Sequence, residues 1–221
     1  MTSYGLRKEM IRYAHRLDAK GFVANHDGNL SARMGDETRF LATPTARAKF
    51  DLKESDLIVV DQTGKTKAGA GRIFSEWAYH SEIYAQLPST KCVVHAHPPF
   101  ASSYALAAQA LPLDFWPEAV VSLGLFVPCI SPAAGSESVP RVGAAARVAS
   151  ACLVQGNGIF AWGDSIEQAY LRLELVEHLA QIYALAQRSG TLRHLPSDAL
   201  QELMQKRKKA GLLAPEERIH G

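Results

Sequence analysis

The chain has 221 residues, 47% of them hydrophobic, and its 24 basic and 22 acidic side chains leave a formal net charge of +2. This length and hydrophobic content suffice for one sizeable domain whose core needs no disulfide bonds. Charges of both signs are interspersed, so the chain lacks the basic stripe that neutralises nucleic-acid phosphates. We therefore expect no nucleic-acid partner.

The start of the chain and its cysteines indicate where the protein works. Charged residues follow Met1 closely, which excludes the apolar region of a signal peptide, and no stretch approaches the ~18 apolar residues of a membrane span. Cys92, Cys129 and Cys152 lie in apolar sequence without CxxC spacing, as buried thiols of a reducing compartment do. We expect a cytoplasmic protein that does not enter a membrane.

Hydrophobic spacing predicts the elements of the first half of the chain. Apolar residues recur at helical spacing from Leu6 to Leu17, and Gly21 ends that helix. Short apolar runs bounded by turn residues predict strands at 29–33, 39–42 and 57–60. A helix is expected at 75–87, before Pro88, followed by a strand that carries His95 and by a helix at 100–110.

The second half contains the strongest helix signal. Two strands are expected within 126–130 and 152–155. Ser165-Ile166-Glu167-Gln168 resembles a capping box, and apolar residues share one face from there to Gln187. A last helix is expected at 199–209, where we interpret the basic run 206–209 as a solvated face.

No linker, internal repeat or regular βαβ alternation divides the sequence. This pattern predicts one domain over residues 1–221, with a C-terminal helical tail at about 197–221. Its class is α+β or three-layer α/β/α, with a central, largely antiparallel sheet flanked by helices. The tail is expected to be mobile or to dock on a neighbour.

The run His95-Ala96-His97 follows the apolar stretch 91–94. Residues i and i+2 of a strand share a face, so both imidazoles can reach one divalent cation. Glu76 lies at the expected start of the helix that leads into this strand. Together these residues predict a metal-assisted acid/base site, although a purely structural histidine pair remains the alternative.

Several motifs, spread along almost the whole chain, resemble those of the class II aldolase/adducin family and follow one another in the same order as in that family. Gly28-Asn29-Leu30-Ser31-Ala32-Arg33 resembles its GNxSxR loop, Thr43-Pro44-Thr45 its TPT turn, Ser75-Glu76-Trp77 with His80 its SEW segment, and His95-Ala96-His97-Pro98 its metal-binding HxH. Gln155-Gly156-Asn157-Gly158 falls where that family has an NHG-type turn. The resemblance implies the class II aldolase fold, while activity has to be argued from the site.

The resemblance implies a metal site in which three histidines hold zinc or a similar divalent ion and a glutamate is the acid/base. His95 and His97 match two ligands, Glu76 matches the glutamate, and Asn157 stands in place of the third histidine. A neutral amide oxygen suits manganese or magnesium better than zinc. Three outcomes stay open: a looser site completed by Asn157, Glu76 and water, recruitment of another histidine such as His26, or loss of metal and chemistry.

The resemblance also implies residues that contact the substrate. These are Gly28, Asn29, Thr43, Thr45 and Ser75. Phe74 and Ala46 replace the serine and glycine that the family's phosphate aldolases use, whereas Arg47 offers a replacement charge. Both a phosphorylated substrate and an unphosphorylated hydroxy-keto acid or aldehyde therefore stay open.

Glu118 is the candidate for a second catalytic acid/base. It follows Trp116, near the place where the family's phosphate aldolases often carry a tyrosine that donates a proton. A carboxyl group in this loop resembles the dehydratase and decarboxylase-like branches. The alternative is a solvated loop carboxylate.

These residues predict a divalent-metal-dependent carbon–carbon lyase of the aldolase type. It would perform retro-aldol cleavage through a metal-stabilised enediolate on a small hydroxy-carbonyl or sugar-phosphate-like substrate. The alternatives are a decarboxylase or dehydratase of the same family acting on a keto or hydroxy acid, and a catalytically degenerate binding or scaffold protein. The resemblance further implies a homotetramer with sites at subunit boundaries.

Overall fold

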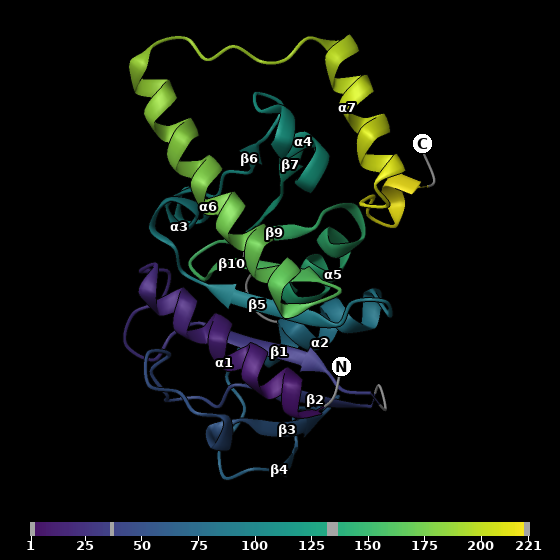
Figure 1. Ribbon diagram of the computed structural model, residues 1–221. Helices are drawn as coiled ribbons and strands as arrows, with labels where there is room; N and C mark the ends of the chain where they lie inside the picture. Colours follow the sequence, from purple (N-terminus) through teal and green to yellow (C-terminus); the bar gives the residue numbers. More distant parts are fainter. Residues whose placement is uncertain (1–2, 36–37, 132–136, 219–221) are drawn as a thin grey trace.

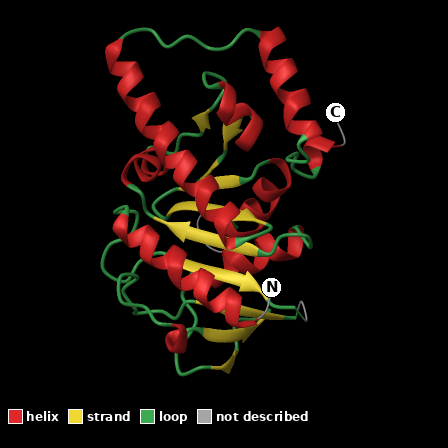
Figure 2. Cartoon of the chain, viewed as in Figure 1, coloured by secondary structure: helices red, strands yellow, loops and turns green. Residues whose placement is uncertain are grey.

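An eight-stranded sheet runs through the protein, with helices packed on both faces (Figures 1 and 2). The computed structural model describes residues 3–35, 38–131 and 137–218. The strands of the sheet, in the order in which they lie side by side, are β4 (Thr66–Ala68), β3 (Ile58–Asp61), β2 (Arg39–Ala42), β1 (Asn29–Arg33), β5 (Cys92–Ala96), β10 (Gly158–Gly163), β9 (Ala151–Val154) and β8 (Cys129–Ile130). A separate two-stranded sheet pairs β6 (Leu111–Pro112) with β7 (Phe126–Val127).

Most of the helices cover the two faces of this sheet, whereas the C-terminal helix packs on the helix at 117–123. The helices are α1 (Ser3–Ala19), α2 (Trp77–Gln86), α3 (Pro99–Leu106), α4 (Pro117–Leu123), α5 (Ser138–Val148), α6 (Ile166–Ser189) and α7 (Ser197–Lys209), with short 3₁₀ turns η1 (Glu54–Asp56) and η2 (Glu216–Arg218). Figure 1 shows α1 and α6 lying across the near face of the sheet. Among the described residues, no helix has the length and apolar character needed to cross a membrane.

Strand β5 lies at the centre of the sheet, between β1 and β10, and is antiparallel to both. In this register Asn29 lies opposite His95, and Ile159 lies opposite Ala96. Only β8 and β9 pair in parallel among the described strands. The predicted α+β or three-layer class with a largely antiparallel sheet is confirmed.

Alternate residues of β5 enter two different hydrophobic cores. Val94 and Ala96 belong to the core that α1, α3 and α6 cover, whereas Val93 belongs to the core beneath α2 and α5. The side chain of His95 points to the α2 side, because it is two residues from Val93 and stacks on Phe160 of that second core. Burying one large aliphatic or aromatic side chain stabilises the fold by about 1.5–3 kcal/mol, so these cores hold β5 firmly.

Two helices of the structure, α4 and α5, were not expected from the sequence. Helix α5 contains Pro140 and Gly143, which reduce the helix signal. Pro140 lies in the first turn, where proline is tolerated, and a Cβ at Gly143 would overlap the Glu82 side chain on α2. Close packing between α2 and α5 therefore explains the glycine.

The C-terminal helix docks on its own chain, and one residue of the basic run departs from the expected solvated face. Arg207 is fully buried. Its guanidinium donates to Glu217 Oε2 at 3.1 and 3.2 Å and to the Val121 carbonyl at 3.1 Å. The interpretation of this run as wholly solvated was wrong for Arg207, because helical spacing turns one residue in four inward.

The turn after β2 contains a strained residue, which yields a prediction about stability. Ala46 has a φ of +57°, a conformation that costs a non-glycine residue about 1–2 kcal/mol. We expect Ala46→Gly to raise the free energy of unfolding by about 0.5–1 kcal/mol in urea titration, since the extra freedom of glycine in the unfolded chain offsets part of the relief. Ala107→Gly is the control, because Ala107 has a φ of −74° and the same change there should destabilise. Equal shifts in both variants would contradict the argument.

Candidate active site

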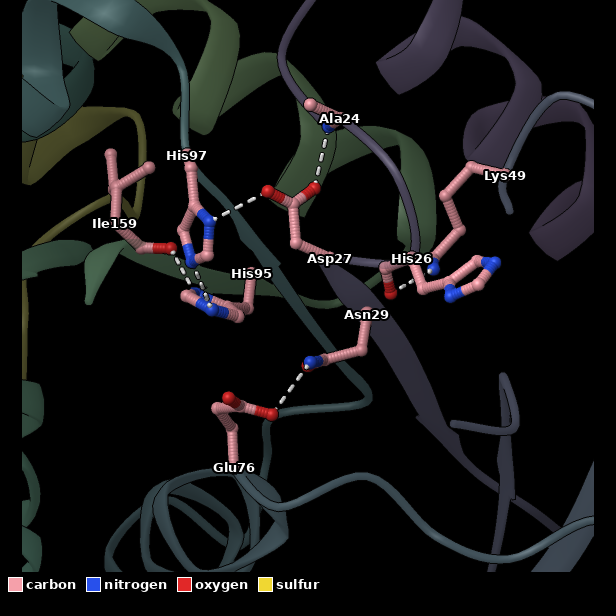
Figure 3. Close-up of polar contacts among 9 residues, drawn as sticks. All are labelled: Ala24, His26, Asp27, Asn29, Lys49, Glu76, His95, His97 and Ile159. Carbon is pink, nitrogen blue, oxygen red and sulfur yellow. Dashed lines mark hydrogen bonds and ion pairs between the residues drawn. The ribbon is translucent and has the colours of Figure 1, made fainter. Parts of the chain in front are cut away.

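Helix α2 begins next to the strand that carries the histidine pair. Glu76 is the N-cap residue of this helix, and its side chain accepts a hydrogen bond from Asn29 Nδ2 at 3.2 Å. Asn29 is itself the residue opposite His95 across the β1–β5 ladder. Figure 3 shows the Glu76 carboxylate directed towards the imidazole pair. The sheet register and the start of α2 thus bring the predicted acid/base to the same end of the sheet as the predicted metal ligands, but among the described residues Glu76 does not form with His95 and His97 a group that could hold a metal ion.

The two imidazoles meet at the end of β5. Their Nε2 atoms lie 3.1 Å apart, although β5 ends at Ala96, one residue before His97. His95 is fully buried, whereas the His97 side chain is 33% exposed. The sequence-based expectation that both rings share one face is confirmed by this contact.

The outer nitrogens of the two rings determine where their protons lie. His95 Nδ1 contacts the Ile159 carbonyl at 2.9 Å, and His97 Nδ1 contacts the Asp27 carboxylate at 3.0 Å (Figure 3). A carbonyl and a carboxylate are acceptors, so each Nδ1 is the donor and each neutral ring carries its proton there. The two Nε2 atoms then face each other with bare lone pairs. Such an arrangement is stabilised by a positive charge between them.

A divalent cation fits this position better than a proton does. Burial and the nearby His97 lower the pKa of His95 to about 3, so a proton shared by the pair is disfavoured near neutral pH. Two nitrogens that bind one tetrahedral zinc at about 2.0–2.1 Å lie about 3.3 Å apart, close to the observed separation. The Nδ1 partners orient the rings as the outer partners of metal-binding histidines do.

The remaining ligands would have to come from other groups. Within the described ranges, no cluster of three or more His, Cys, Asp or Glu side chains could hold a metal ion. Asn157 lies in the turn between β9 and β10, where its backbone N–H donates to the Val154 carbonyl at 2.9 Å. The next residue, Gly158, has a φ of +73° and lies so close to the carbonyl of Ala96 and the ring of His97 that a Cβ would overlap both. The turn therefore reaches the edge where His97 lies, and the role of Asn157 as a ligand stays a prediction.

A row of buried aromatic rings supports the histidine pair from behind. Phe160 stacks on His95 with ring centroids 4.1 Å apart, and His80 meets the edge of Phe160 at 5.8 Å. His80 also contacts Ser31 Oγ through Nδ1 at 2.7 Å. Burial, reinforced by the nearby His95, lowers the pKa of His80 well below its usual value, which keeps this ring neutral. These contacts give His80 a packing role behind His95.

Two charged residues at the site were not assigned a role from the sequence. Asp27 contacts His97, and Lys49 is buried with its Nζ donating to the carbonyls of Arg47 at 2.9 Å and His26 at 3.4 Å. Burial lowers the pKa of Lys49 to about 8, although the negative charges of Asp27 and Glu76 oppose this shift. No local sequence pattern marks Lys49 as a site residue. Asp27, in contrast, could have been noticed as an acidic residue next to the GN loop.

His26, the substitute ligand considered from the sequence, is exposed. Figure 3 shows its ring on the Lys49 side of the loop, turned away from the imidazole pair. Recruitment of His26 as a third imidazole therefore requires a different loop conformation from the one described.

The predicted substrate-contacting residues converge on this end of the sheet. Gly28 packs against the carbonyl of His95. The Thr43 hydroxyl accepts a hydrogen bond from the Leu30 N–H at 3.2 Å, so Thr43 joins β1 to the turn after β2. Asn29 Oδ1 is buried and, within the described chain, has no hydrogen-bond partner. Ser75 is exposed, immediately before Glu76.

A shallow depression of about 350 Å³ adjoins the turn after β2, and Thr45, Arg47 and Arg72 are among its lining residues. The Thr45 N–H donates to the Arg72 carbonyl at 2.9 Å, which ties this turn to the segment that leads to Glu76. Phe74, in that segment, is buried against the rings of Trp77 and His80 and occupies the place of a hydroxyl donor. Arg47 and Arg72 bring positive charge to this depression, where Arg47 also forms an ion pair with Asp56 at 3.6 Å.

Glu118 lies elsewhere, on α4, and is exposed. It lines a wide depression of about 1130 Å³ alongside α6, whose wall also includes Phe22 and Pro99. Both of these residues lie close to His97, since Pro99 is two positions further along the chain and the Phe22 carbonyl accepts the His97 N–H at 2.9 Å. The proposed catalytic role of Glu118 stays a prediction.

Comparison with known proteins gives one consistent answer. Residues 8–184 match the family described as the Class II Aldolase and Adducin N-terminal domain. A 5-methylthioribulose-1-phosphate/5-deoxyribulose-1-phosphate aldolase from Rhodospirillum rubrum is 28% identical over 93% of this chain and 92% of its own. A methylthioribulose-1-phosphate dehydratase from Acidiphilium cryptum is 28% identical over 78% of this chain and 86% of its own. The solved structure of an L-fuculose 1-phosphate aldolase superposes with a TM-score of 0.83 at 27% identity, over 94% of this chain and 98% of that one.

The buried ammonium group of Lys49 leads to a prediction about pH. Its pKa is about 8 in the folded chain, against about 10.4 for an exposed lysine, so between these values the unfolded chain holds the proton that the native chain has released. Stability attributable to this residue therefore rises with pH across that window, by up to about 3 kcal/mol. We expect urea titrations at pH 7.5 to 10 to show this rise in the wild type and its loss in Lys49→Met. Lys65→Met, at an exposed lysine, should follow the wild type.

Proposed function

Since the chain belongs to the class II aldolase and adducin family, we propose that it is a divalent-metal-dependent lyase that cleaves a small phosphorylated hydroxy-ketone by retro-aldol chemistry. The observation that carries the proposal is the pair of bare Nε2 atoms of His95 and His97, 3.1 Å apart, with the Glu76 carboxylate facing them. Relatives named as aldolases and dehydratases of sugar phosphates support an enzyme of this kind.

His95 and His97 would hold the ion, and Asn157 with water would complete its ligands. When bound, a divalent ion supplies Lewis-acid stabilisation for negative charge that develops on the substrate carbonyl. The amide oxygen of Asn157 favours manganese or magnesium relative to the zinc expected from the family.

Glu76 would move the proton in the retro-aldol step. It takes the proton from the hydroxyl group beside the scissile bond, the carbon–carbon bond breaks, and its electron pair moves towards the ketone carbonyl. The Asn29 amide donates to Glu76 Oε2, which orients the carboxylate and leaves Oε1 to receive the proton. A proton returned to the carbon that has gained the electron pair completes the reaction.

Asn29 also offers a contact for the substrate. A buried acceptor without a partner costs about 1–3 kcal/mol, and a substrate hydroxyl that donates to Asn29 Oδ1 would remove this cost. Arg47, Arg72 and the Thr45 turn would receive the phosphate group, since bidentate guanidinium contacts suit phosphate oxygens.

Dehydration is the second candidate reaction. The relatives include methylthioribulose-1-phosphate dehydratases, and loss of water from a hydroxy-ketone needs an acid that protonates the leaving hydroxyl. Glu118 is the candidate for that acid. Glu118 lines the same wide depression alongside α6 as Phe22 and Pro99, which supports this assignment.

The working form is proposed to be a cytoplasmic homotetramer. Support comes from large apolar side chains exposed on one chain, which a second copy would cover. They include Leu171 and Leu185 on α6 and Leu106 on α3.

Incubation with 5-deoxyribulose 1-phosphate tests the proposed function. Cleavage of this substrate should release dihydroxyacetone phosphate and acetaldehyde, whereas dehydration should give one product lighter by one water, and mass spectrometry separates the two. We expect cleavage, lost after prolonged chelation and restored by manganese or zinc. Full activity in rigorously metal-depleted protein would overturn metal dependence, and release of water alone would favour the second candidate.

Glu76→Gln tests the proton carrier. Glutamine keeps the size and an acceptor for Asn29 but cannot take a proton, so we expect kcat to fall about 10²–10⁴-fold with KM changed little. Glu82→Gln, on the same helix but paired with Gln86, is the matched control and should retain wild-type turnover. Unchanged kcat in the Glu76 variant would mean that another group moves the proton.

A further inference from the structure

The loop that precedes β1 places a carboxylate on the outer nitrogen of His97. Asp27 Oδ2 lies 3.0 Å from His97 Nδ1, and Asp27 Oδ1 accepts a hydrogen bond from the Ala24 N–H. Both oxygens are therefore engaged, one on the loop itself and one on the imidazole (Figure 3). This geometry leaves the Asp27 carboxylate little freedom.

We propose that Asp27 is a positioning residue that holds His97 in the tautomer with a bare Nε2, and that it thereby strengthens binding of a divalent ion in a site whose third histidine is replaced by Asn157. The inference rests on the proposed function, since it concerns the same ion. It adds a residue outside the ligand set, acting through His97.

His97 needs such a partner more than His95 does. His95 is fully buried, and its Nδ1 proton is fixed by a main-chain carbonyl that can only accept. His97 is 33% exposed, so water could satisfy either of its nitrogens and both neutral tautomers would be populated without a fixed acceptor. The contact with Asp27 selects the tautomer whose Nε2 faces His95.

The negative charge of Asp27 matters in a site poor in anionic ligands. Two neutral imidazoles and a neutral amide leave the charge of a divalent ion uncompensated apart from Glu76. A carboxylate hydrogen-bonded to a ligating imidazole makes that nitrogen more basic and lowers the energy of the bound cation. Lys49, a buried cation of the segment after β2, donates to main-chain carbonyls and also interacts electrostatically with the Asp27 carboxylate.

The loop has anchors that do not involve the Asp27 side chain. The Phe22 carbonyl accepts the His97 N–H at 2.9 Å, the Asp27 N–H donates to the Ala24 carbonyl at 3.1 Å, and Lys49 Nζ reaches the His26 carbonyl. Gly28, with a φ of +68°, packs against the main chain of β5. A change of the carboxylate alone should therefore leave the loop in place.

Asp27→Asn is the test variant, because asparagine has nearly the same shape and can donate its amide N–H to His97 Nδ1. The proton then moves to Nε2, the nitrogen that should face the ion, as an aspartate-to-asparagine change does beside a catalytic histidine. Two-bond ¹H–¹⁵N NMR on metal-free protein should show a larger share of His97 protonated at Nε2. Competition with a chromophoric chelator should show zinc and manganese affinities weakened about 10–100-fold.

Two further variants separate this role from loop folding. Asp27→Glu keeps the carboxylate and should recover part of the affinity, and Asp51→Asn makes the same chemical change at an exposed position and should bind metal as the wild type does. Thermal unfolding of the metal-free variants reports whether the loop and the fold survive.

The outcomes distinguish this inference from the proposed function. If the wild type binds metal, and Asp27→Asn has the same metal affinity and the same His97 tautomer, the inference alone is overturned. Weakened binding in Asp27→Asn, together with no turnover of any hydroxy-ketone by the metal-loaded wild type, supports the inference and overturns the proposed reaction. A wild-type protein that binds neither zinc nor manganese overturns both.

Discussion

The contact between the Nε2 atoms of His95 and His97 is the constraint on which the site depends. Each ring gives its only proton to an acceptor on its outer side, a main-chain carbonyl for His95 and a carboxylate for His97. Two bare lone pairs 3.1 Å apart repel each other unless positive charge lies between them. Burial makes a protonated His95 unfavourable, which supports the proposed metal ion at this position.

The fold brings four segments to this contact. Antiparallel pairing of β5 with β1 and β10 brings Asn29 and the turn before Gly158 to the end of the central strand, and the start of α2 adds Glu76. The loop that contains Asp27 crosses the same end. The buried rings of Phe160 and His80 fill the space behind, so the position of His95 is set by packing as well as by hydrogen bonds.

Several residues of this site adapt the family's plan to this chain. Phe74 fills space with an aromatic ring, Ala46 holds a strained backbone conformation, and Asn157 is the proposed source of a neutral ligand oxygen. Arg47 and Arg72 line the depression at the turn after β2 and are the proposed source of positive charge there. Under the proposed function, anion recognition would therefore depend more on guanidinium groups and less on hydroxyl groups.

Local patterns in the sequence determined the fold class, strands β1 and β5 at the centre of the sheet and the pairing of His95 with His97, whereas β10, which pairs with β5, was not predicted. Hydrophobic period, capping residues and the i, i+2 relation act within a few residues and are visible in one dimension. Helix α5 was missed because Gly143 weakens the local helix signal, although close packing against α2 requires a glycine there. Arg207 was misjudged because its buried guanidinium is stabilised by Glu217, a partner that the local pattern does not show.

Only the tertiary structure decided the surroundings of the site. Asp27 reaches His97 across 70 residues of sequence, Asn29 reaches Glu76 across 47, and Lys49 is buried by loops without periodic sequence signals. The sequence by itself could name the two imidazoles and the carboxylate beside them. Which acceptors hold their protons, and so which nitrogens are bare, depends on contacts between distant segments that arise when the chain packs.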